Sequence, residues 1–65
     1  MKLDFRFLAH DDTLEARIDG GYYHISGWAS VFRVNAYVAH EHYAIGDFDN
    51  IYDALEAANN HYKGK

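Results

Sequence analysis

A chain of 65 residues is long enough for one small domain, here residues 1–65, which buries only about 60% of the surface that its unfolded form exposes. The chain has no cysteine, which excludes disulfides and thiolate zinc sites as supports for its core. Its net charge of −4, and the absence of any run of ~20 apolar residues, favour a soluble, cytoplasmic protein that binds neither free nucleic acid nor a membrane.

Two strands are predicted at the start of the chain, because apolar and polar residues alternate there with a period of two. They cover residues 3–9 and 14–19. Residues 10–13 have turn chemistry, so the two strands should form a hairpin. Gly20 and Gly21 end the second strand and permit a positive φ.

The middle of the chain predicts further strands. A short strand over residues 22–25 would end in a turn or bulge at residues 26–27, and the longest strand would follow over residues 29–39. Residues 40–42 form either the end of that strand or a turn, and residues 43–45 could add a last short strand. The residues of the longest strand expected on its core side are Phe32, Val34, Ala36 and Val38.

Residues 51–63 are predicted to form an amphipathic helix, the clearest element of the chain. Asn50 is a good N-cap, the Asp53 carboxylate can reach back to it as in a capping box, and Gly64 can end the helix. The apolar stripe consists of Ile51, Ala54, Leu55, Ala58 and Tyr62. The side expected to face water carries Tyr52, Asp53, Glu56, Asn59 and Lys63.

The simplest packing of these elements is an α+β fold, a four- or five-stranded antiparallel sheet with the C-terminal helix on one face. The other face is then open, and it is either a merely solvated surface or a binding surface. The chain has six tyrosines, four phenylalanines and one tryptophan, more than so small a core can hide, and exposed aromatic residues are favoured interface anchors. The expected open face comprises Arg6, Glu15, Arg17, Val31, Arg33, Asn35, Tyr37 and part of residues 22–28.

No group of residues predicts catalysis or a cofactor. The serines lack a nucleophile motif, and the glycine pair does not open a helix, so there is no phosphate-binding loop. His40 and His42 have a spacing that some metal sites use, but a metal would need a third ligand, and we interpret the pair as ordinary surface histidines. We therefore expect a protein that is not an enzyme and holds no metal.

Residues 28–33, residues 45–49 and the alanine-bearing helix form a pattern that resembles a known family. Over residues 22–63 the chain is similar to the three-stranded-sheet-plus-helix domain of plant ethylene-response factors and of integrase arm-binding domains. That family reads DNA with arginines and tryptophans on its exposed sheet face, and Trp28 and Arg33 match two of those positions. The strand order also resembles HicB-type antitoxins. Size and composition are similar to phage-encoded inhibitors, among them anti-CRISPR proteins and inhibitors of uracil-DNA glycosylase.

These observations lead to two functional hypotheses. The first is a small, acidic, non-enzymatic protein-binding module, a phage or mobile-element inhibitor that mimics DNA and binds a basic surface of a host enzyme that handles nucleic acid. The residues expected to contact that partner are Tyr22, Tyr23, Trp28, Arg33, Asn35, Tyr37, Asp47, Asp49, Asp53 and Glu56. The alternative is a DNA-binding domain that uses Arg6, Arg17, Arg33 and Trp28 of the sheet face. A homodimer through the open face, or through an edge strand over residues 3–9, is a third arrangement.

Overall fold

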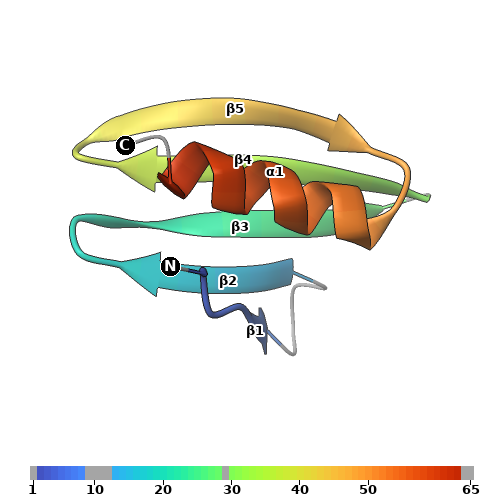
Figure 1. The fold of residues 1–65 in the computed structure, drawn as a ribbon, viewed down its shortest axis with the longest axis horizontal. Coiled ribbons are helices and arrows are strands. Elements are labelled where there is room, and N and C mark those ends of the chain that lie inside the picture. The colour runs from blue at the N-terminus through green and yellow to red at the C-terminus, as the bar shows by residue number, and fades with distance from the viewer. Residues whose placement is uncertain (1, 9–12, 29, 64–65) are drawn as a thin grey trace.

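The computed structural model describes residues 2–8, 13–28 and 30–63, with the backbone alone for Trp28. Strands adjacent in the chain are adjacent in the sheet, so the sheet order is β1-β2-β3-β4-β5 and every pair is antiparallel. The helix packs over β3, β4 and β5, as Figure 1 shows. The predicted α+β fold is confirmed, with five strands. The elements are β1 (Arg6–Leu8), β2 (Thr13–Ile18), β3 (Gly21–Trp28), β4 (Val31–Val38), β5 (Glu41–Phe48) and α1 (Ile51–Lys63).

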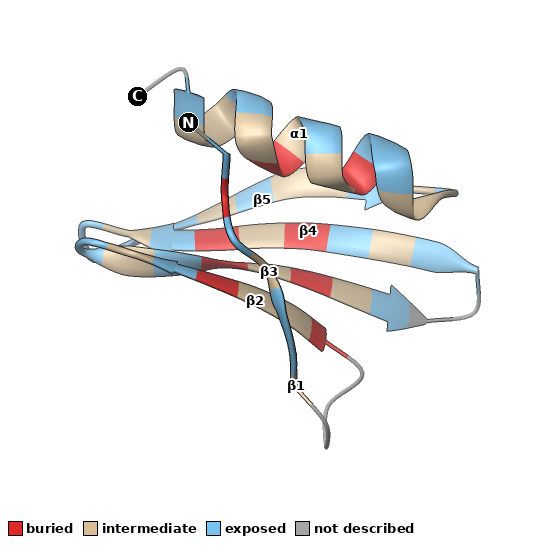
Figure 2. Ribbon diagram, turned by 60° about the horizontal axis from the view of Figure 1, so that its bottom comes forward, coloured by how far each residue is buried: buried red, intermediate tan, exposed pale blue. Residues whose placement is uncertain are grey.

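The core lies between α1 and the face of the sheet that the helix covers. Alternate residues of the strands point into it, including Ile25, Val34 and Ala36, and each of these is almost completely buried. Ala54 and Ala58 face them from the helix, and because these side chains are small the helix can approach the sheet closely. Figure 2 shows the buried positions on facing sides of the two layers. Each large aliphatic side chain buried here contributes about 1.5–3 kcal/mol to folding.

The N-terminus of the helix has the predicted cap. The backbone N–H of Asp53 donates to Oδ1 of Asn50 at 2.9 Å, which satisfies one of the free amides of the first turn. The reciprocal half of the capping box differs from the prediction. The Asp53 carboxylate accepts from the Asn50 side-chain amide, also at 2.9 Å. The predicted stop, Gly64, lies outside the described residues.

The start of the chain differs from the predicted strand over residues 3–9. Only β1, Arg6–Leu8, pairs with β2, while Ala9 lies outside the described residues. Residues 2–5 leave the sheet and rise towards the helix, as Figure 2 shows. Leu3 is buried, and its N–H donates to Oδ1 of Asn59 at 2.7 Å. Asn59 was expected to face water, but it is half-buried because it holds this segment.

Two strands are longer than predicted. β3 does not end at residue 25: Ser26 and Gly27 continue the ladder opposite β4, where Gly27 leaves room for the ring of Phe32. β5 spans eight residues instead of residues 43–45. Its pairing with β4 shifts between Val34 and Asn35, so that Ile45 is an extra, bulged residue.

Two tight turns close the hairpins at the same end of the sheet. Asp19 and Gly20 connect β2 to β3, and Gly20 has a φ of 85°. Ala39 and His40 connect β4 to β5, and both have positive φ, 54° and 67°. The N–H of Ala39 donates to the carbonyl of Gly20 at 3.0 Å, so the two turns are tied together. Gly21, the first residue of β3, lies so close to β4 that any Cβ there would collide with the carbonyl oxygen of Tyr37.

Candidate functional site

The face of the sheet opposite α1 has no layer over it among the described residues. We call this surface the open face. Every residue that the sequence placed on it by name lies there, because the antiparallel register brings the alternate residues of all five strands to one side. The open face includes Arg6, Glu15, Arg17, Tyr22, His24, Ser26, Val31, Arg33, Asn35, Tyr37, His42, Ala44 and Asp47.

A pair of stacked tyrosines lies on the open face, at the end of the sheet that the two tight turns close. Tyr22 of β3 and Tyr37 of β4 are cross-strand partners whose rings lie nearly parallel, with centroids 5.9 Å apart. The ring of His24 lies 4.4 Å from that of Tyr22 and extends the group along β3. The two tyrosines remain 36% and 41% exposed, so they present a rigid aromatic surface to solvent.

Glu15 binds two other polar side chains on the β2 side of the tyrosines. Its carboxylate accepts from Nε2 of His24 at 2.9 Å and from Nε of Arg17 at 3.0 Å. These hydrogen bonds, that from His24 first, hold the pKa of Glu15 below its ordinary value. Asp4 and Arg6 complete a shallow polar hollow of about 350 Å³ with Glu15 and Arg17. The hollow therefore carries charges of both signs.

A second ion pair frames the other side of the open face. Arg33 of β4 donates to both carboxylate oxygens of Asp47 of β5, from Nε at 2.9 Å and from Nη2 at 3.3 Å. This two-pronged contact lowers the pKa of Asp47 and raises that of Arg33. Next to it, Nε2 of His42 donates to Oδ1 of Asn35 at 3.2 Å. His42 was not expected on this face, because the bulge at Ile45 interrupts the alternation of β5.

Tyr23, which was expected to contact the partner, does not lie on the open face. It points into the core, is completely buried, and its hydroxyl is hydrogen-bonded to Nδ1 of His61 at 2.6 Å. Tyr62 packs edge-on against it, and Tyr43 lies against the His61 ring. Burial raises the pKa of the Tyr23 hydroxyl. This cluster attaches the end of the helix to the sheet, and the buried Tyr23 offers no contact to a partner.

The acidic residues of the predicted site do not all lie together. Asp47 is on the open face, whereas Asp53 and Glu56 are exposed on the helix, on the opposite side of the molecule. Asp49 lies between β5 and α1. The side chain of Trp28 lies outside the described residues. The predicted contact residues therefore form two separate surfaces, an open face with all three arginines of the chain and an acidic helix side.

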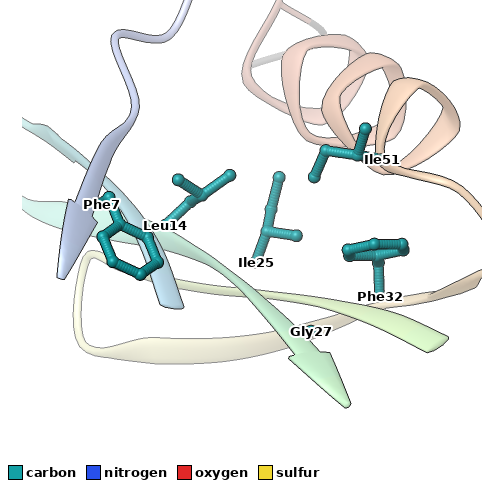
Figure 3. Close-up of a pocket in the computed structure, with 6 residues that line it drawn as sticks. All are labelled: Phe7, Leu14, Ile25, Gly27, Phe32 and Ile51. Carbon is teal, nitrogen blue, oxygen red and sulfur yellow. The ribbon is translucent and has the colours of Figure 1, made fainter. Parts of the chain in front are cut away.

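One apolar hollow remains on the helix side of the sheet. It measures about 350 Å³ and lies where α1 begins, between the helix and β1. Figure 3 shows Phe7, which is 62% exposed, at one rim and Ile51 at the other. The full lining is Phe7, Leu14, Ile25, Gly27, Phe32 and Ile51. The side chains of this lining include no polar group that could orient a ligand. We therefore interpret the hollow as a part of the sheet that the helix does not cover.

The described residues include no group of three or more histidine, cysteine, aspartate or glutamate residues that could hold a metal ion. His40 lies in the β4–β5 turn and His42 on the open face, bound to Asn35. Within the same residues, α1 is too short and too polar to cross a bilayer. Comparison of the chain with protein-family models, with curated proteins and with solved structures found no match.

Proposed function

We propose that this protein is a binding module that recognises another protein through its open face. The observation that carries the proposal is the stacked pair of Tyr22 and Tyr37, part-exposed on a sheet face with no covering layer among the described residues. Tyrosine is enriched at binding hot spots, because it supplies a large contact area with few rotatable bonds to fix. In this position the two rings are the natural anchors of an interface.

The polar surroundings of the tyrosines also suit a protein partner. The Glu15–Arg17 and Arg33–Asp47 pairs are already formed, so their geometry needs no reorganisation on binding. Polar groups at the rim of an interface confer orientation and exclude wrong partners, while central aromatic residues supply most of the affinity. On the open face, the Glu15–Arg17 pair lies beside the stacked tyrosines, and the Arg33–Asp47 pair lies further along the strands.

The narrower form of the proposal is an inhibitor of an enzyme that handles nucleic acid, a viral protein of the anti-CRISPR type. It is supported by the net charge of −4 and by the exposed carboxylates Asp49, Asp53 and Glu56, which could stand in for phosphates. Because these carboxylates lie away from the open face, such an enzyme would have to reach the helix side in addition to the open face. Neutralising them with Asp53→Asn and Glu56→Gln should then weaken binding, and unchanged binding would reject the inhibitor form alone.

The open-face proposal is tested by capture of a partner from nuclease-treated lysate, followed by measurement of the affinity of each variant. Tyr22→Ala and Tyr37→Ala should each weaken the complex by more than ~1 kcal/mol. Tyr52→Ala is the matched control, since Tyr52 is 79% exposed on the helix and the same atoms are removed from the opposite side. Loss of binding with Tyr52→Ala, and none with the other two variants, would place the interface on the helix and refute the proposal.

A second candidate, nucleic-acid binding by the same face, is favoured by one observation: Arg6, Arg17 and Arg33 all lie there. Two of them are bound to carboxylates, which reduces what they offer to phosphates. Binding of this kind would fall steeply with salt concentration, because phosphate contacts release counterions. Arg6→Gln and Arg17→Gln should then reduce the salt dependence. Recovery of nucleic acid alone from untreated lysate, lost at high salt, would favour this candidate over a protein partner.

A further inference from the structure

The rings of Tyr22 and Tyr37 lie where a covalent bond between them can form. The two residues are direct partners across β3 and β4, and their rings are inclined by only 13°, with centroids 5.9 Å apart. The Cβ atoms of direct cross-strand partners lie about 4.5–5.5 Å apart, so the two side chains leave the sheet side by side. Small rotations about the side-chain bonds therefore bring the ring carbons next to the two hydroxyl groups into contact.

Both rings are accessible from solvent. Tyr22 and Tyr37 are among the exposed large apolar side chains of the protein. Neither of their hydroxyl groups is held by a hydrogen bond within the described part of the chain. A small oxidant can therefore reach both rings, and a proton released from either hydroxyl group passes directly to water.

A second pair of tyrosines lies at almost the same distance but differs in orientation and burial. The centroids of Tyr23 and Tyr62 are 6.0 Å apart, and the rings are inclined by 81°, so that the edge of one points at the face of the other. Tyr23 is completely buried, and its hydroxyl group is bonded to Nδ1 of His61. Burial also raises the pKa of Tyr23, which opposes the loss of its proton. This core pair should therefore stay unlinked where the exposed pair reacts.

We propose that Tyr22 and Tyr37 are a modification site, at which a one-electron oxidant joins the two rings as dityrosine. Each tyrosine loses one electron to the oxidant and one proton to water, which leaves two neighbouring tyrosyl radicals. The radicals combine into a carbon–carbon bond between ring carbons next to the hydroxyl groups. The hydrogen displaced from each of these carbons moves, as a proton, to the phenol oxygen of the same ring, and both rings become aromatic again.

The reaction balances with persulfate as the oxidant. The chain loses two electrons and two protons in all, and the two electrons reduce one persulfate ion to two sulfate ions. The new bond joins β3 to β4 in the register that they already have, so the fold needs no rearrangement.

The reaction does not depend on the proposed protein partner, because it needs only the two rings and an oxidant. If that partner also docks on these rings, the link changes the shape of its anchors. Binding through the open face would then be sensitive to oxidation.

The experiment is brief illumination of the dilute full chain with persulfate and a ruthenium–bipyridine photosensitiser, which together supply a one-electron oxidant. Dilution keeps collisions between chains rare. Dityrosine is followed by its fluorescence, and mass spectrometry of the intact product should show a single chain that has lost two hydrogen atoms. Addition of oxygen to other side chains raises the mass, so the two kinds of product are distinguished.

Single substitutions identify the linked residues. Tyr22→Phe and Tyr37→Phe each remove one phenol and should abolish the single-chain product. Tyr62→Phe, from the core pair, and Tyr52→Phe, on the exposed side of the helix, are the matched controls and should leave its yield unchanged. Circular dichroism of each variant before oxidation shows that it is folded.

Three results would overturn the proposal. The wild type could give no dityrosine, or only links between separate chains. The single-chain product could survive in Tyr22→Phe or in Tyr37→Phe. Its loss in a folded Tyr62→Phe variant would place the link in the core instead of on the open face.

Discussion

The turn between β4 and β5 stores backbone strain that a double substitution should release. Ala39 and His40 both have positive φ, 54° and 67°, as in the two-residue turns that match the twist of a hairpin. Such turns favour Asn followed by Gly, and alanine is poorly suited to a left-handed conformation. Both side chains are exposed, so their replacement removes little packing. We expect Ala39→Asn combined with His40→Gly to stabilise the protein.

The magnitude follows from two opposing contributions. A left-handed conformation costs an ordinary L-residue about 1–2 kcal/mol, and glycine adopts it freely. Glycine also increases the conformational entropy of the unfolded chain, which offsets about 0.4–1 kcal/mol of the gain at position 40. The double variant should therefore gain on the order of 1 kcal/mol. For a domain of 65 residues this corresponds to a rise of about 4–8 °C in Tm.

Thermal unfolding followed by circular dichroism measures the change, with urea unfolding to confirm that the m-value stays constant. Gly20→Ala is the matched control in the neighbouring turn. Gly20 has a φ of 85° and no heavy atom within 4 Å of the added methyl, so the substitution adds strain without a clash. It should lower Tm by a similar amount. An unchanged or lower Tm in the double variant, with the expected fall in Gly20→Ala, would refute the strain argument at Ala39 and His40.

Two further predictions concern single hydrogen-bonded groups. Asn59→Ala removes the acceptor of the Leu3 N–H, so it should cost about 1–2 kcal/mol in urea unfolding and speed hydrogen exchange at Leu3, whereas Asn60→Ala, on the exposed side, should do neither. Glu15 has a lowered pKa in the folded state, so at pH values above its unfolded-state pKa of 4.5 its ionised carboxylate stabilises the fold. This stability is lost as the pH falls through the folded-state pKa. Glu15→Gln should therefore flatten the acid limb of the stability curve, and an unaltered limb would exclude this role for Glu15.

The helix and the faces of β4 could be predicted because their signals are local. The Asn50 cap and the spacing of Ala54 and Ala58 fix the start and the buried side of α1. In β4, strict alternation places Val34 in the core and Arg33 on the open face. The direction of these side chains can be predicted without their partners in the fold, because the period of the element alone sets it.

The other features depend on pairing between distant parts of the chain. Tyr22 and Tyr23 were both expected to contact the partner. Consecutive residues of a strand point to opposite faces, and pairing with Tyr37 and Ala36 shows that Tyr22 is the one on the open face. The bulge in β5 appears only against β4, so the extent of β5 could not be read from its own residues. The bond from Leu3 to Asn59 joins residues 56 positions apart and has no local signal.

The order of the elements along the chain has a consequence for synthesis. Every strand pairs with its neighbour in sequence, so the sheet can grow hairpin by hairpin as the chain leaves the ribosome, with short loops to close. The layer that covers its apolar side comes after all five strands. Until residues 51–63 emerge, Ile25, Val34 and Ala36 have no cover from the helix, and the nascent sheet is open to aggregation. If translation stalls between β5 and α1, the apolar face of the finished sheet therefore stays exposed, and the chain is then most prone to aggregate.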